Sequence, residues 1–233
     1  MKATYFKAIN LFSQASTESL DTLSQFTQRN FYKKNNLLLD YDQSKNTFLY
    51  VMSGWIKLFK ETSDGVEVIV DVITQGHFCG EKFMFDATEK EPYKALSISD
   101  VEFLTMPTHI IKKLISTDHI FALHFLRATL EKQQHNNNHR EHLTMQNATE
   151  RIACFILRLL DSKKKLTLQL PYDKTLLASH LGMRPETFSR ALKNLSKQCG
   201  VHVQGGNINI DHPDNLIRYV YEHCSNITPC NLH

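Results

Sequence analysis

The chain has 233 residues, of which 42% are hydrophobic and 22% charged, and its formal net charge is +3 at pH 7. This length and apolar content suit two small domains, and so small a net charge does not by itself indicate that the protein binds nucleic acid. The five cysteines form no C-x-x-C pair, and the sequence has neither a signal peptide nor an apolar run long enough to span a membrane. We therefore expect a cytoplasmic protein with reduced thiols and no membrane partner.

The first third of the chain changes from helical to strand patterns. Residues 5–30 have apolar residues at helical spacing and Ser or Thr suited to caps. From Phe31 to Met106 the apolar runs are short, at 37–39, 48–52, 55–59, 66–72 and 101–106, and turn pairs such as Ser53-Gly54 and Asp64-Gly65 separate them. Many short strands between Gly turns predict a β-barrel or jelly roll.

A long helix is expected from Asp118 to Leu143. Its first half carries apolar residues at helical spacing, whereas the positions that continue the stripe are polar: Gln133, Asn137, Arg140 and Thr144. Polar residues in a helix seam specify register but weaken association. A second helix is predicted to begin at Asn147, which can form a capping box with Glu150.

Three histidines, His135, His139 and His142, follow each other on one face of this long helix. Their spacing can gather imidazoles around a metal ion. A solvated polar face is the alternative that we favour, because no carboxylate or cysteine is placed to complete the site.

Residues 170–197 are typical of two short helices around a tight turn. The first is expected to open at Asp173 and to end at Gly182, and the second to run from Pro185 to Ser196. The second helix has an inward stripe and a polar outer face; the stripe is Phe188, Ala191, Leu192 and Leu195, and the outer face is Glu186, Ser189, Arg190 and Lys193. These outer side chains can bond to base edges, although a plain surface helix would look similar.

The flanking segments complete a winged helix-turn-helix. A helix begins near Arg151, a strand is expected at 166–170, and residues 201–210 read as a hairpin turning at Gly205-Gly206, before a helical tail at 214–223. Lys163, Lys164 and Lys165 form a basic cluster suited to phosphates.

The segment Pro185-Glu186-Thr187-Phe188-Ser189-Arg190 resembles the E-x-x-S-R recognition helix of the Crp/Fnr family of bacterial transcription regulators. The resemblance covers nearly the whole chain, since residues 49–54 and 76–81 look like the family's cyclic-nucleotide-binding jelly roll. It implies an α+β fold with a sensor jelly roll and N-terminal helices at 1–117, a dimerisation helix and hinge at 118–146, and a winged helix-turn-helix at 147–233. It also implies a homodimeric activator that contacts double-stranded DNA and RNA polymerase, and that is not an enzyme.

The recognition helix matches the Fnr-like branch, because Crp-like members carry Gly where this chain has Ser189. The resemblance implies a TTGAT-N4-ATCAA-like palindrome, with base contacts from Glu186, Ser189 and Arg190. Backbone contacts are expected from Thr187, Lys193 and the lysines at 163–165.

The resemblance also implies an effector pocket, with residues at Cys79, Gly80, Glu81, Lys94, Asn136 and Asn137. Members that bind cyclic AMP follow the Gly-Glu pair with an Arg-Ser pair for the phosphate. Here Lys90-Glu91-Pro92-Tyr93-Lys94 occupies that stretch. Glu91 would repel a phosphodiester, and Lys94 lacks the forked geometry of arginine, so we expect no binding of cyclic AMP.

Residues 80–85 and 147–149 are most similar to the nitric-oxide-responsive, haem-linked (Dnr-like) members, so haem with NO or another diatomic gas is the expected effector. Haem needs an axial donor. Cys79, His77 and His124 are the candidates, although Cys79 could equally be a core residue. No cysteine precedes Cys79, so no iron–sulfur cluster is expected. The main alternative is a Crp/Fnr-type regulator with a different small ligand or with ligand-independent activity. A cyclic-nucleotide-binding protein or a cupin enzyme is the last alternative, because a cupin metal site needs a second histidine close to His77.

Overall fold

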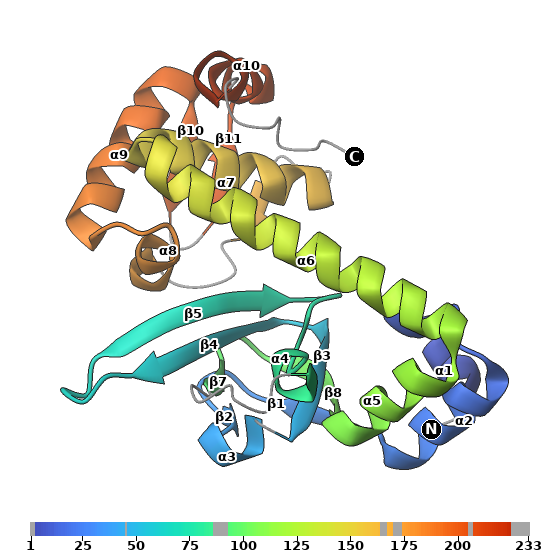
Figure 1. Ribbon diagram of the computed structural model, residues 1–233. Coiled ribbons are helices and arrows are strands. Elements are labelled where there is room, and N and C mark those ends of the chain that lie inside the picture. The colour runs from blue at the N-terminus through green and yellow to red at the C-terminus, as the bar shows by residue number, and fades with distance from the viewer. Residues whose placement is uncertain are drawn as a thin grey trace. The chain divides into compact units, whose positions relative to one another are not determined.

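The computed structural model describes residues 3–44, 46–85, 93–163, 167–169, 174–204 and 207–224. The chain divides into two compact units, residues 1–133 and 134–233 (Figure 1). This boundary lies inside the long helix α6 (His119–Met145), whereas the sequence predicted divisions at either end of that helix. The difference arises because Phe121 and Phe125 in the first half of α6 belong to the core of the first unit.

Two four-stranded antiparallel sheets form the centre of the first unit, as the jelly-roll prediction requires. The first sheet has the order β1-β8-β3-β6, and the second has the order β2-β7-β4-β5. Their strands are β1 (Gln28–Tyr32), β2 (Leu37–Leu39), β3 (Thr47–Ser53), β4 (Trp55–Glu61), β5 (Glu67–Thr74), β6 (Phe78–Cys79), β7 (Lys94–Ser97) and β8 (Val101–Pro107). Residues 28–30 were expected to be helical, but together with Phe31 and Tyr32 they form β1, which pairs along its whole length with β8.

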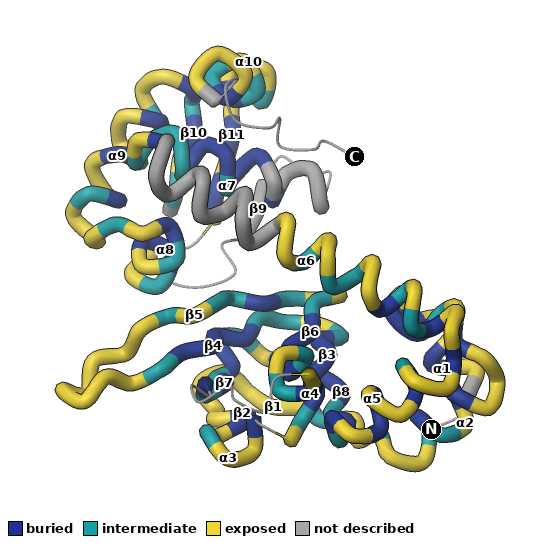
Figure 2. Tube along the Cα trace, viewed as in Figure 1, coloured by how far each residue is buried: buried dark blue, intermediate teal, exposed yellow. Residues whose placement is uncertain are grey.

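Alternation along the strands gives the first unit two cores. On β3, Leu49 and Val51 point between the sheets, where they share a core with Ile56, Leu58 and Phe103. Phe48 and Tyr50 point to the other side, where they pack against helices. The strands β3 and β6 of the first sheet are therefore buried on both faces, as their dark segments in Figure 2 illustrate, whereas the edge strand β1 is mostly exposed.

Helices cover the outer face of the first sheet. They are α1 (Ala3–Lys7), the 3₁₀ turn η1 (Asn10–Phe12), α2 (Thr17–Phe26), α5 (Thr108–Thr117) and the first half of α6, and the shorter α3 (Tyr41–Ser44) and α4 (Lys82–Phe85) lie beside the strands. Aromatic rings fill this layer: Phe12 stacks on Phe121 with ring centroids 6.1 Å apart, and Phe121 in turn contacts Phe125 at 5.8 Å. None of the described helices is long and apolar enough to cross a membrane.

Asp118 joins the N-terminal helices to the start of α6. Its Oδ1 accepts from the amide of Phe121 at 3.0 Å, and its Oδ2 accepts from the Ser16 amide at 2.8 Å and the Ser19 hydroxyl at 2.7 Å. Burial alone raises the pKa of this carboxyl, but the hydrogen bonds to its ionised form outweigh burial and lower the pKa from 3.8 to about 2. Asp118 is thus both the N-cap of α6 and its anchor to α2.

Because the folded-state pKa of Asp118 lies below its unfolded value, its ionised form stabilises the fold above about pH 4, and this contribution disappears as the pH falls toward 2. We expect Asp118→Ala to lower the free energy of unfolding by about 3 kcal/mol at pH 7, since three donors lose a charged acceptor. Urea denaturation between pH 2 and pH 7 measures both effects. Asp100→Ala, at an exposed pair with Lys33, is the control and should change stability far less; equal losses in the two variants would refute this role of Asp118.

The second unit is a winged helix-turn-helix, as predicted. Its helices are α7 (Ala148–Lys163), α8 (Lys174–His180), α9 (Pro185–Cys199) and α10 (Pro213–Cys224). A three-stranded antiparallel sheet of order β10-β11-β9 joins β9 (Thr167–Gln169), β10 (Val201–Gln204) and β11 (Asn207–Ile210). The predicted capping box is present. The Glu150 carboxylate accepts from the backbone N–H of Asn147 at 2.9 Å, and Asn147 Oδ1 accepts from the backbone N–H of Glu150 at 3.1 Å.

Candidate functional site

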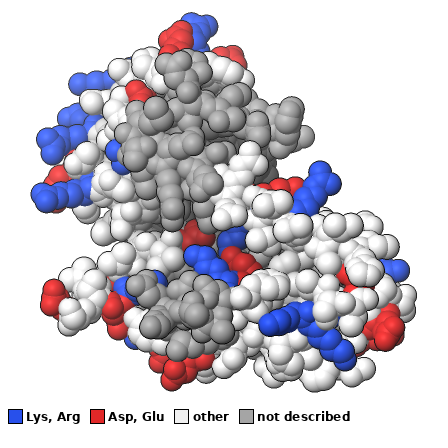
Figure 3. Space-filling model, in the orientation of Figure 1, with Lys and Arg blue, Asp and Glu red and all other residues white. Residues whose placement is uncertain are grey.

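Helix α9 has the two faces that the sequence predicted. Phe188, Ala191 and Leu195 are buried, whereas Leu192, expected in the same stripe, is only partly buried. The outward side chains of Glu186, Ser189, Arg190 and Lys193 are exposed, and Thr187 is partly buried. Lys and Arg side chains gather along the edge of the second unit where Figure 1 labels α9 (Figure 3). These four exposed side chains, the polar row of α9, are therefore accessible to a large partner.

The turn before α9 is fixed by Gly182 and Arg151. Gly182 has a φ of +64°, a left-handed conformation in which glycine is unstrained. Arg151, on α7, donates from Nη1 to the carbonyl oxygens of Leu181 at 2.8 Å and Gly182 at 3.2 Å, and from Nε to the Gln146 carbonyl at 3.0 Å. One guanidinium thus ties α7 to the turn of the helix-turn-helix. The sequence placed Arg151 in α7 but gave no sign of this contact.

Removing the guanidinium should loosen the turn without touching the polar row of α9. If α9 contacts DNA, as the resemblance implies, we expect Arg151→Ala to weaken that binding about ten-fold at matched and mismatched sites alike, since the orientation of α9 is lost while its exposed side chains remain. Fluorescence anisotropy with a TTGAT-N4-ATCAA duplex and with a mismatched duplex measures the change. Arg218→Ala, on α10, serves as the control; a selective loss at the matched site only would show that Arg151 reads a base.

Several predicted phosphate contacts cannot be placed beside α9. The backbone of Lys163 ends α7, but its side chain lies outside the described residues, as do Lys164 and Lys165. The side chain of Lys193 is exposed one turn after Ser189, so its position fits a backbone contact at the end of the polar row.

Gly80 and Glu81 lie at the junction of β6, α4 and α6. Gly80 has a φ of +103°, and a Cβ there would lie 2.4 Å from the carbonyl oxygen of Thr47, so only glycine fits. The Glu81 carboxylate accepts from Lys132 Nζ at 2.6 Å, and Lys132 also donates to the Phe78 carbonyl at 2.8 Å. Both side chains of this pair are largely buried, at 13% and 15% exposure. Glu81 therefore links the sensor sheet to α6, a contact that the sequence did not reveal.

Lys94, another expected effector residue, does not join Glu81. Lys94 donates to Glu61 Oε2 at 3.0 Å, because Ala95 and Ser97 take the buried positions of β7 and leave Lys94 on the opposite face. Glu91 and Pro92 lie outside the described residues, as do the side chains of Asn136, Asn137 and the three helix histidines, His135, His139 and His142.

The three candidate haem donors have different surroundings. Cys79 is 2% exposed in the core between the sheets, and burial raises the pKa of its thiol to about 12 against the opposing effect of the Lys132 charge. His77 lies with Nδ1 3.2 Å from the Thr74 carbonyl oxygen, and His124 is partly buried on α6. Among the described residues, no group of three or more His, Cys, Asp or Glu side chains is arranged to hold a metal ion.

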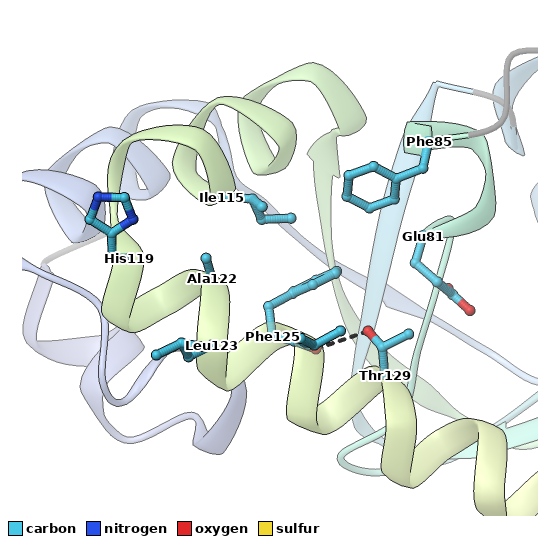
Figure 4. A pocket seen from close by; sticks show the side chains of 9 residues that line it. Glu81, Phe85, Ile115, His119, Ala122, Leu123, Phe125 and Thr129 are labelled. Atoms are coloured by element: carbon cyan, nitrogen blue, oxygen red, sulfur yellow. Dashed lines mark hydrogen bonds between the residues drawn. The ribbon is translucent and has the colours of Figure 1, made fainter.

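An apolar cavity of about 540 Å³ lies between α4, α5 and α6 (Figure 4). Ile115, Ala122 and Phe125 line its middle, His119 lies at one end and Glu81 at the other. This volume is in the range of small-molecule sites. Cys79, His77 and His124 are not part of its lining, and the sequence did not predict it.

An apolar face of α6 is exposed, and two of its residues, Leu123 and Leu126, also line the cavity. Ile120, Leu123, Leu126 and Leu130 have between 54% and 68% of their surface open to solvent. The spacing of Leu123 and Leu130 is one heptad, which is typical of a helix seam that pairs with a second helix. The predicted dimer helix therefore has an apolar first half, while Gln133, at the start of its polar half, is exposed.

Two family models match the chain in the order in which the units occur. The model described as a cyclic nucleotide-binding domain matches residues 29–118, and the Crp-like helix-turn-helix domain matches residues 150–219. The cAMP-activated global transcriptional regulator CRP of Pasteurella multocida is 23% identical over 181 residues, which cover 76% of this chain and 87% of the relative.

Solved structures agree in fold. FixK2 from Bradyrhizobium japonicum superposes with a TM-score of 0.70 at 22% identity, over 82% of this chain and 96% of that one. DNR from Pseudomonas aeruginosa superposes less well, with a TM-score of 0.50 at 23% identity, over 91% of this chain and 99% of that one. Because both domain models match in sequence and the fold is that of the solved regulators, this protein belongs to the Crp/Fnr family of DNA-binding transcription regulators.

Proposed function

We propose that the protein is a homodimeric activator that binds a TTGAT-N4-ATCAA-like palindrome under the control of a ligand in its sensor domain. The observation that carries this proposal is the exposed row of Glu186, Ser189 and Arg190 on α9. Arginine can bond bidentately to guanine, glutamate can accept from the cytosine paired to it, and serine can reach the neighbouring thymine. Thr187, Lys193 and the lysines at 163–165 would hold phosphates, which fix the register of the helix on DNA.

The exposed apolar face of α6 supports the homodimer. Crp/Fnr regulators bind DNA as dimers and contact RNA polymerase. A two-fold pairing through Leu123 and Leu130 would present two recognition helices to successive major grooves, one helical turn or about 34 Å apart. The half-sites must then be inverted repeats.

Selection of bound duplexes from a random pool tests the half-site without assuming it. We expect enrichment of inverted TTGAT repeats, because Ser189 takes the place of the glycine found in Crp-like members. Enrichment of a GTGA core would instead mean that Ser189 does not discriminate between the two half-site types. A direct repeat would contradict the two-fold dimer.

Haem with NO is the candidate for the sensor ligand that the motif resemblance favours, but Cys79, one of the donors expected for it, does not fit. The Cys79 thiol is closed into the core between the sheets with a pKa raised to about 12, so it is not a ready thiolate ligand. Cyclic AMP is not proposed, because Lys94 is paired with Glu61. A haem-based sensor would then use an imidazole: His77 or His124, as the sequence predicted, or His119, which lies at the end of the apolar cavity.

Titration with haemin and absorption spectroscopy test the haem proposal. A saturable Soret band that shifts with NO, and that changes in His119→Ala but not in His109→Ala, would support haem at the cavity. His109 is an exposed histidine on α5 and is a suitable control. A spectrum equal to that of free haemin would exclude haem as the ligand.

A further inference from the structure

We propose that His202 is a positioning residue for DNA recognition, which holds the β10–β11 wing against the end of α9 and holds it more firmly when the imidazole is protonated. The ring of His202 bridges two segments. Its Nδ1 lies 3.1 Å from the hydroxyl oxygen of Ser196 on α9, and its Nε2 lies 3.0 Å from Oδ2 of Asp211, the residue after β11. These three side chains form the wing clamp.

The backbone around Gly200 brings the wing clamp together. Gly200 caps α9 with a φ of +67°, a left-handed conformation that glycine adopts without strain. Its N–H donates to the Ser196 carbonyl at 3.0 Å, and its carbonyl accepts from the Asp211 N–H at 3.1 Å. A Cβ on Gly200 would lie 3.2 Å from the Cβ of Asp211, so the end of α9 and the end of the wing approach each other closely.

Strand pairing places His202 on the open face of the wing. His202 pairs with Asn209, whereas its neighbour Val201 pairs with Ile210. Val201 and Ile210 are buried, so alternation along the strands leaves His202 and Asp211 on the opposite face. The side chains of His202 and Asp211 are 49% and 54% exposed. Protons and salt therefore reach the wing clamp directly.

Both hydrogen bonds of His202 are compatible with either charge state of the imidazole. In the neutral ring with its proton on Nε2, Nε2 donates to the Asp211 carboxylate and Nδ1 accepts from the Ser196 hydroxyl. A second proton on Nδ1 reverses the bond to Ser196, because Nδ1 then donates to Oγ and the hydroxyl rotates. The bond to Asp211 becomes charge-assisted, which strengthens it. Protonation therefore tightens the clamp without rearranging it.

The charged groups on the surrounding elements set the sign of this effect. Among the described residues, Asp211 is the acidic side chain that pairs with His202. The other titratable side chains in the last two turns of α9 and around the start of α10 are exposed: Lys193, Lys197, His212 and Asp214. Solvent and salt screen such exposed charges, whereas Asp211 is in direct contact. Acidification should therefore strengthen the clamp.

The wing clamp acts on the end of α9 that is expected to meet phosphates. Arg151 ties down the turn before α9, and the clamp ties down the opposite end, near Lys193. A helix held at both ends presents its polar row in one orientation. Because phosphate contacts fix the register without reading sequence, a looser clamp should weaken binding to all duplexes alike. This inference rests on the DNA binding by α9 proposed above.

The test compares the dissociation constants of DNA complexes at pH 8 and pH 6. Fluorescence anisotropy is measured with the full chain at constant ionic strength, on a TTGAT-N4-ATCAA duplex and on a mismatched duplex. We expect the ratio of the two constants to be about three-fold larger in the wild type than in His202→Gln, a modest effect because the ion pair is exposed. His212→Gln removes an exposed histidine outside the clamp and should keep the wild-type ratio.

Asp211→Asn separates the wing clamp from a direct effect of charge on DNA. This variant keeps the imidazole and its added proton but removes the carboxylate that the proton strengthens, so its ratio should fall to that of His202→Gln. A wild-type ratio in Asp211→Asn would mean that the charge of His202 acts on DNA directly, and would overturn the proposal. Equal ratios in His202→Gln and the wild type would overturn it as well.

Hydrogen exchange measures the wing clamp without DNA. At pH 6 the Asp211 amide, which donates to Gly200, should exchange about three-fold faster in His202→Gln and in Ser196→Ala than in the wild type, and at the wild-type rate in His212→Gln. Unchanged exchange in both clamp variants would refute the clamp. Faster exchange, together with a wild type that binds neither duplex, would count against DNA binding by α9 alone. Ser196→Ala replaces either wing variant in the DNA test should that variant fail to fold by circular dichroism.

Discussion

Arg190→Ala should weaken binding to a TTGAT-N4-ATCAA duplex by about 1 to 3 kcal/mol per half-site and should remove selectivity at the G·C pair only. The side chain is exposed on the outer row of α9, next to Ser189 and one turn after Glu186, where a bidentate contact to guanine is possible. Titration against the matched duplex and single-base variants measures the effect. The loss should disappear when the G·C pair itself is replaced.

Lys193→Ala provides the comparison for Arg190→Ala. Because Lys193 is expected to meet a phosphate, its removal should weaken all duplexes alike and lower the salt slope of binding by about one unit. The two variants should therefore differ in kind as well as in size. Equal weakening of matched and mismatched duplexes by Arg190→Ala would make Arg190 a backbone contact and would refute its assignment to a base.

Leu130→Asp should dissociate the dimer. Leu130 is 56% exposed, so the substitution leaves the core of its own unit intact. In a two-fold interface each substitution acts twice, and burying two like charges against an apolar seam should raise the dissociation constant by at least about 100-fold. Analytical ultracentrifugation over a concentration series measures this constant.

The control for Leu130→Asp is Lys112→Asp, which changes an exposed residue of α5 away from the leucine face. We expect Lys112→Asp to remain dimeric and Leu130→Asp to be a folded monomer with weak affinity for the palindrome. An unchanged dissociation constant in Leu130→Asp would place the dimer interface on another surface.

Local patterns in the sequence predicted the elements well. The apolar run at 48–52 identified β3, and Asn147 with Glu150 identified the start of α7, because both signals depend on neighbours in the chain. The polar row of α9 was predicted for the same reason: a helical period fixes which side chains share a face.

Contacts between distant segments could not be predicted. Asp118 accepts from Ser16, which lies 102 positions earlier, and Arg151 donates to Leu181, 30 positions later. The sequence also could not show which apolar face of α6 packs against its own unit. Phe121 is in the core and Leu123 is exposed, but the two faces of the helix are equally apolar in sequence. Lys94 was assigned to an effector pocket by its position in a motif. Alternate side chains of β7 point to opposite faces of the sheet, and Lys94 lies on the face where it pairs with Glu61.

The spacing between half-sites tests the central claim most directly. The full chain should be titrated onto TTGAT duplexes in inverted orientation with spacers of four, five and six base pairs, and the stoichiometry determined at saturation. Two protomers, each with one recognition helix in a half-site, should bind the duplex with the four-base-pair spacer as a dimer. One added base pair moves and rotates the second half-site, and should lower the affinity at least about ten-fold. Equal affinity for all spacers, or one protomer per duplex, would contradict the account.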